Sequence, residues 1–165
     1  MKKLIIATVI AGLFLTSCQK ANRDELSPAA TETTTAATAV TSSGWIPVTF
    51  SAGAQTGKGL TASTGSVLTT AVDNGILEDG LVLVFGKTDA VVNLLPFQGA
   101  DLEWSYNVSQ GEISIVAIGK KELSSASMLT VVIPSAKIAE LEKTGYTRSD
   151  LLNIPYEKAQ TLFNL

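Results

Sequence analysis

Hydrophobic and polar residues alternate along the middle of the chain with the period of a β-strand. Apolar side chains stand at every second position from Leu102 to Val108, and polar side chains stand between them. Such alternation places one face of a strand against a core and the other face in solvent. The segment 81–85 is instead apolar at every position, so we expect a strand that is covered on both faces at the middle of the core.

Further segments have the composition of strands, rich in β-branched and aromatic residues. They are 45–50, 60–62 within a loop of small residues over 52–66, 90–95, 112–118 and 128–133. Pro47 confines the first of them to a sheet edge or to the first residues of a strand, because proline cannot donate to the ladder. Turns at 86–89 and 110–111 would join the neighbouring segments into hairpins.

After Pro134 the apolar period changes from two to nearly four, which indicates helices. Ser135 is in position to cap a helix over 136–143, and Gly145 lies just past its end. A second helix is predicted over 155–164, with Pro155 in its first turn. The fold class expected for residues 44–165 is therefore mainly β, an antiparallel β-sandwich-like domain with one or two short C-terminal helices packed on it.

The N-terminal residues have the layout of a secretory signal. Two lysines follow Met1, and an apolar run over 4–15 ends just before Cys18. At 1.5 Å per residue this run covers roughly 18 Å, against the roughly 30 Å of hydrocarbon that a spanning helix must cross. The pattern Leu15-Thr16-Ser17-Cys18 resembles the lipobox of bacterial lipoproteins. This resemblance implies removal of residues 1–17 and a diacylglycerol anchor on Cys18; the alternative is an ordinary cysteine after a non-lipidated signal.

Residues 18–43 are expected to be the lipid anchor and a flexible tether. Thr, Ala and Ser dominate this segment, which cannot bury enough apolar surface to offset the entropy of ordering. As a coil, about 25 residues would hold a domain some 25–30 Å from a membrane. A glycosylated stalk over 31–41 is the alternative. Gln19, rather than aspartate after the cysteine, resembles the sorting signal of outer-membrane lipoproteins, so the predicted location is the cell outer membrane, facing the periplasm or the exterior.

Composition excludes several kinds of chemistry. The chain has no histidine and one cysteine. If Cys18 carries a lipid, serine–histidine hydrolysis, cysteine–histidine catalysis, zinc sites and iron–sulfur clusters lack their residue types. With 12 Lys and Arg against 15 Asp and Glu, and no basic block, nucleic acid is not an expected partner. We expect no cofactor.

Two segments invite a ligand-binding interpretation that their spacing does not support. Residues 53–59 contain Gly57-Lys58, but Ala52 and Gly59 stand where a phosphate loop needs glycine and Ser or Thr. Asp73, Glu78 and Asp79 are weak candidates for a calcium site, because their spacing matches no twelve-residue calcium loop. A turn followed by a short helical piece is the favoured interpretation of 73–80.

Two residue pairs on the segment 101–108 are further candidates. Trp104 and Tyr106 lie two apart and could stack a sugar, although the inner face of a sheet is the favoured interpretation. Asp101 and Glu103 share a strand face, but a glycosidase needs two carboxyls that flank a cleft, so solvated charge is favoured for them.

Five segments in order resemble a group of small Bacteroidota lipoproteins of unknown function. They are 45–48, 76–84, 95–96, 131–134 and 156–165. The resemblance implies a β-sandwich-like domain on a lipidated tether, and it assigns no catalytic or binding residue. We therefore expect a non-enzymatic envelope protein, held to the membrane through Cys18, that presents its domain for structural, binding or adhesion purposes to an unknown glycan or protein ligand. The alternative is a carboxylate-dependent envelope hydrolase or isomerase acting on glycans, which needs neither histidine nor cysteine.

Overall fold

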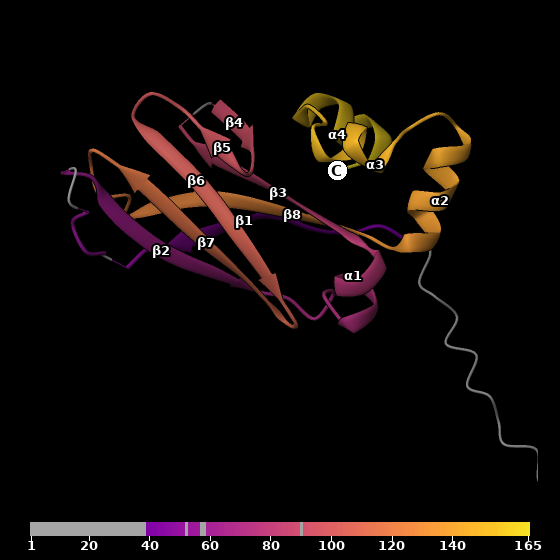
Figure 1. Cartoon of the computed structure of the whole chain (residues 1–165), viewed down its shortest axis with the longest axis horizontal. Coiled ribbons are helices and arrows are strands. Elements are labelled where there is room, and N and C mark those ends of the chain that lie inside the picture. Colours follow the sequence, from indigo (N-terminus) through magenta and orange to yellow (C-terminus); the bar gives the residue numbers. More distant parts are fainter. Residues whose placement is uncertain (1–38, 52, 57–58, 90) are drawn as a thin grey trace, which may run out of the picture. The chain divides into compact units, whose positions relative to one another are not determined.

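The computed structural model describes residues 39–51, 53–56, 59–89 and 91–165 (Figure 1). Cys18, the predicted signal and most of the predicted tether lie outside the described residues. In the part of the chain that is described, no helix combines the length and the apolar character needed to cross a membrane.

The described strands form two antiparallel four-stranded sheets, which confirms the predicted mainly-β, sandwich-like class (Figure 1). The first sheet has the order β1-β8-β3-β4 and the second the order β2-β7-β6-β5. The strands are β1 (Thr41–Thr49), β2 (Thr61–Leu68), β3 (Leu81–Thr88), β4 (Val91–Leu94), β5 (Phe97–Gln98), β6 (Leu102–Ser109), β7 (Glu112–Gly119) and β8 (Ser125–Ile133). β1 lies at a sheet edge, as Pro47 predicts, and it begins at Thr41, inside the segment expected to be tether.

The core between the sheets is built from the inward faces that the alternating patterns predict. Trp104 on β6 is 1% exposed, and Ile113 and Ile115 on β7 are fully buried beside it. Val84 and Met128 meet them from the opposite sheet. Trp104 is therefore a core residue, and the predicted hairpin of β6 and β7 is confirmed by their antiparallel register.

Tyr106 ties the two sheets together with a hydrogen bond. Its hydroxyl donates to the backbone oxygen of Val82 on β3 at 2.9 Å. Burial raises the pKa of the Tyr106 phenol above its ordinary value, as expected where the charged form would be poorly solvated. Tyr106 is thus a structural residue, and a sugar platform formed with Trp104 is not available.

Helices cover the other face of the first sheet. The described helices are α1 (Asn74–Asp79), α2 (Ser135–Lys143), α3 (Arg148–Leu152) and α4 (Tyr156–Phe163). Ile138, Leu151 and Ala159 from the last three pack against Leu83 and Phe85 of β3. β3 is thus buried on both faces, which confirms the prediction made from its unbroken apolar run. Figure 1 shows α2 to α4 gathered toward one end of the strands.

The C-terminal helices differ from the prediction in two ways. Ser135 is the first residue of α2 and not its cap, because the chain is still extended at Pro134, whose carbonyl accepts from the amides of Lys137 and Ile138. The five-residue α3 was not predicted. It is held by a capping box in which Thr147 and Asp150 bond reciprocally.

The turn predicted at 86–89 is wrong for its first three residues, because β3 continues through Gly86 to Thr88. At this position of the strand, glycine leaves the space that the indole of Trp104 occupies. A Cβ placed on Gly86 would lie 1.8 Å from Cζ3 of the indole. The chain turns later, at Asp89, whose φ of +52° lies in the left-handed region, and β4 then pairs antiparallel with β3 as predicted.

The strand predicted at 60–62 is confirmed in part, because β2 runs from Thr61 to Leu68, and the loop predicted around it over 52–66 is wrong in its second half. Gly65 lies where the end of β1 crosses β2, and a Cβ there would approach Cγ1 of Val48 to 2.8 Å. The strand therefore depends on close contact with β1 and on pairing with β7 rather than on its own propensity.

Candidate functional site

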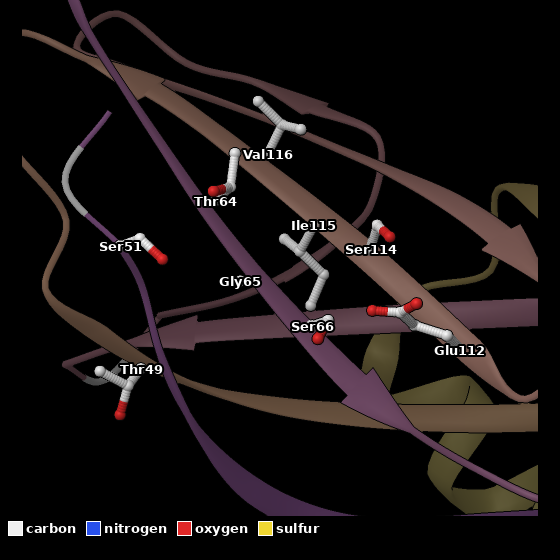
Figure 2. A pocket seen from close by; sticks show the side chains of 9 residues that line it. All are labelled: Thr49, Ser51, Thr64, Gly65, Ser66, Glu112, Ser114, Ile115 and Val116. Atoms are coloured by element: carbon white, nitrogen blue, oxygen red, sulfur yellow. The ribbon is translucent and has the colours of Figure 1, made fainter. Parts of the chain in front are cut away.

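A groove of about 500 Å³ lies on the outer face of the second sheet, where β1 ends beside β2 (Figure 2). Hydroxyl-bearing side chains from three segments of the chain line most of it, with a single carboxylate. The lining residues are Thr49, Ser51, Thr64, Gly65, Ser66, Glu112, Ser114, Ile115 and Val116. The groove thus offers many neutral hydrogen-bonding groups and one negative charge.

The strand register brings these side chains to one face. Ser66 of β2 is opposite Ser114 of β7, and Thr64 is opposite Val116. Because successive side chains of a strand point to opposite faces, Thr64, Ser66, Ser114 and Glu112 project outward together (Figure 2). Val67 and Ile113 project to the opposite side, toward the other sheet, and are buried.

Among the described residues, the edge of β2 is paired only in part. Ser51 forms two backbone hydrogen bonds with Thr64, at 2.8 and 3.3 Å, and the Ala62 amide donates to Ala54. In an antiparallel strand, residues two apart direct their amides and carbonyls to the same side. The backbone groups of Ser66 therefore point to the same side as those of Thr64, but beyond the reach of the segment that pairs with it. They add a peptide donor and acceptor at the rim of the groove.

The structure does not bring the calcium candidates together. Asp73 caps α1, with its carboxylate accepting from the Ile76 amide at 2.9 Å. Glu78 and Asp79 lie on α1 and are exposed, and the guanidinium of Arg148 donates to the backbone oxygens of Asp79 and Gly80. Within the described ranges, no group of three or more acidic, cysteine or histidine side chains could hold a metal ion. The predicted turn and short helix at this place are confirmed.

The two candidate carboxylates, Asp101 and Glu103, lie on either side of the first residue of β6. Asp101 precedes the strand and Glu103 is within it, and both line a small hollow of about 190 Å³. Asp101 forms an ion pair with Lys120 at 2.5 Å, in which both side chains are mostly exposed. The hydrogen bond and positive charge of Lys120 hold the pKa of Asp101 below its usual value. This direction is opposite to the one that a general acid at neutral pH requires.

The phosphate-loop segment is described only in part. Lys58 lies outside the described residues, as do Ala52 and Gly57. Gln55 forms an isolated bridge with Thr61, and a Cβ on Gly53 would overlap the backbone oxygen of Ala62. This part of the segment therefore runs against the start of β2.

Sequence reasoning missed the groove because its residues look like loop. The outward residues Thr64 and Ser66 alternate with Ser63, Gly65 and Val67, which offer little apolar contrast. Only their pairing with the strongly alternating β7 reveals a strand face. Comparison of the chain with protein-family models, with curated proteins and with solved structures finds no match.

Proposed function

We propose that this protein is a lipid-anchored envelope protein whose β-domain binds a ligand without transforming it. The observation that carries the proposal is the groove of Figure 2, which five hydroxyl groups and the backbone of Ser66 line, with the carboxylate of Glu112 at one end. Neutral donors and acceptors on a rigid sheet suit the recognition of a glycan or an extended peptide.

The alternative, a hydrolase or isomerase acting on glycans through carboxylates, has less support. Among the described residues that line the groove, Glu112 is the only carboxylate, whereas glycoside hydrolysis uses a pair that flanks the bond to be cleaved. Asp101 and Glu103 line a smaller hollow, where Lys120 favours the ionised form of Asp101. Proton donation by Asp101 near neutral pH is therefore disfavoured.

The membrane part of the proposal rests on Leu15-Thr16-Ser17-Cys18 and the apolar run before it. The Cys18→Ser variant is expected to move from the membrane fraction to the soluble fraction, or to accumulate uncleaved. Each buried CH₂ of an acyl chain contributes about 0.8 kcal/mol, so losing the chains removes the attachment. Fractionation followed by immunoblotting measures this. Normal cleavage with unchanged membrane association of the variant would contradict lipidation.

A substitution that places an arginine side chain in the groove tests whether ligands bind there. Titrating the isotope-labelled full chain, in detergent, with panels of extended peptides and of oligosaccharides is expected to shift amide resonances around Thr64, Ser66 and Ser114. Ser66→Arg should weaken such binding at least about tenfold, since a long charged side chain would occupy the groove. Gln98→Arg is the matched control, because Gln98 is exposed on the edge strand β5 of the same sheet and is absent from the groove lining.

Two results would contradict the proposal. If no probe shifts the resonances around Thr64, Ser66 and Ser114, or if these shifts survive Ser66→Arg, the groove is not the binding site. Hydrolysis of an oligosaccharide probe that is lost in Asp101→Asn or Glu103→Gln would instead support the enzyme alternative.

A further inference from the structure

The helices leave one end of the outer face of the first sheet uncovered. Trp45, Leu129 and Phe85 form one row across β1, β8 and β3. Tyr156 of α4 packs on this row, with ring centroids 5.6 Å from Trp45 and 5.5 Å from Phe85. The next row on the same face is Pro47, Ser127 and Lys87. We call the surface formed by Trp45, Pro47, Lys87, Asp89, Ser125 and Ser127 the open shelf.

Trp45 is held in a fixed orientation at the inner end of the open shelf. Its Nε1 donates to the hydroxyl of Tyr156 at 3.3 Å, and the two rings are tilted by 59°. The ring of Tyr156 packs edge-on against the ring of Phe85, and Phe85 is 0% exposed. Trp45 nevertheless remains 36% exposed. An aromatic ring that is fixed before binding loses little conformational freedom when a ligand stacks on it.

A hollow of about 420 Å³ continues the shelf away from the helices. Pro47, Lys87, Asp89 and Ser127 are among its lining residues. The ammonium of Lys87 lies 5.9 Å from the centroid of the Trp45 ring, and no carboxylate of the described residues lies within ion-pair distance of it. Packing of Trp45 on Tyr156 accounts for the orientation of the indole, but not for the neighbouring hollow, which polar side chains and the apolar Pro47, Leu123 and Ala126 line together.

We propose that the open shelf binds a neutral oligosaccharide of two or three sugar units. One face of a pyranose ring presents C–H groups, which suit stacking on the exposed indole of Trp45. The hydroxyls of the following units can accept from Lys87 and donate to Asp89 and Ser127. Lys87 is two residues beyond the Trp45 row, about 7 Å at the rise of a strand, and the hollow continues past it to Asp89, so the shelf is longer than one sugar ring.

The charges on the shelf select against ionic ligands. Lys87 beside the indole repels a cation that would otherwise stack there, and Asp89 opposes an anion at the other end. The shelf belongs to the first sheet and the groove of Figure 2 to the second, and their lining residues do not overlap. The inference therefore holds or fails independently of the groove and of the lipid anchor.

Tryptophan fluorescence of the full chain tests the proposal. The chain has two tryptophans, and Trp104 is 1% exposed, so quenching by acrylamide reports on Trp45. Maltotriose, cellotriose, xylotriose, mannotriose and chitotriose are the probes. At least one is expected to protect Trp45 in a saturable way at concentrations up to about 10 mM. A trimer of galacturonic acid and the cation spermidine are expected to give no protection.

Variants distinguish the shelf from other surfaces. Calorimetric titration of the protecting sugar should show about tenfold weaker binding to Lys87→Met, because a charge-assisted hydrogen bond is lost. Trp45→Phe should weaken binding as well, while keeping an aromatic ring against Tyr156. Gln98→Arg, on β5 of the second sheet and outside both the groove and the shelf, should bind as the wild type does.

Circular dichroism spectra establish that the variants are folded. The proposal is overturned if none of the five sugars protects Trp45, if only the acidic trimer protects it, or if folded Lys87→Met and Trp45→Phe both bind with wild-type affinity.

Discussion

Replacing Leu83 by alanine will lower the free energy of unfolding by about 2–5 kcal/mol. Leu83 is 1% exposed at the centre of β3, in the cluster that joins this sheet to α2, α3 and α4. Truncation leaves a cavity between the first sheet and the C-terminal helices, and these closely packed layers cannot move together enough to fill it. For a domain of this size the loss is a large part of the total stability. Urea unfolding followed by circular dichroism measures it.

The control for this prediction is Val91→Ala. Val91 is 61% exposed on the edge strand β4, so its truncation should change the free energy of unfolding by no more than about 0.5 kcal/mol. Equal losses in the two variants would mean that the helices do not pack on β3 as the structure has them.

Placing a methyl group on Gly86 will destabilise the domain by about 1–3 kcal/mol or more. The added Cβ of Gly86→Ala would lie 1.8 Å from Trp104, which is enclosed between the sheets and has little room to move. If this contact is the cause, Trp104→Leu should relieve it. The loss in the double variant should then be smaller than the sum of the two single losses by about 0.5–3 kcal/mol.

A double-mutant cycle of unfolding free energies measures this coupling. Gly75→Ala is the matched control, since its Cβ would meet only the Asp73 carboxylate at 3.4 Å, an ordinary contact, within the short helix α1. It should be neutral or slightly stabilising. Losses for Gly86→Ala and Trp104→Leu that add without coupling would show that strand conformation, not the indole, selects glycine at position 86.

Hydrophobic periodicity predicted two kinds of strand. In one kind a single face is buried, and in the other kind both faces are buried. The alternation over 102–108 and the unbroken run over 81–85 correspond to β6 and β3. The signal failed where a distant residue decides the conformation. Glycine is typical of turns, but Gly86 is in a strand, because the indole of Trp104 lies where its Cβ would be. The small residues of β2 form a strand because β1 and β7 flank them.

The candidate sites were less predictable than the fold. The sequence draws attention to Trp104 and Tyr106, which are spaced for a shared face, and that face is the core. Trp45 was predicted only as part of a strand. Its exposure depends on where α4 begins on the sheet, because Tyr156 is the first residue of that helix. Its polar neighbour Lys87 comes from β3, two strands away across the sheet. The sheet topology brings Trp45 and Lys87 together, and no local sequence pattern indicates this proximity.

The position of β1 determines how the domain would carry mechanical load. β1 is the edge strand that follows the predicted tether, and its hydrogen-bonded neighbour is β8, from Thr41 opposite Val132 to Thr49 opposite Ser125. Under the proposed anchoring and sugar binding, tension would enter at Thr41 and leave through the open shelf at the other end of the strands. The ladder between β1 and β8 would then be loaded in shear, with its hydrogen bonds sharing the force, instead of being unzipped one bond at a time.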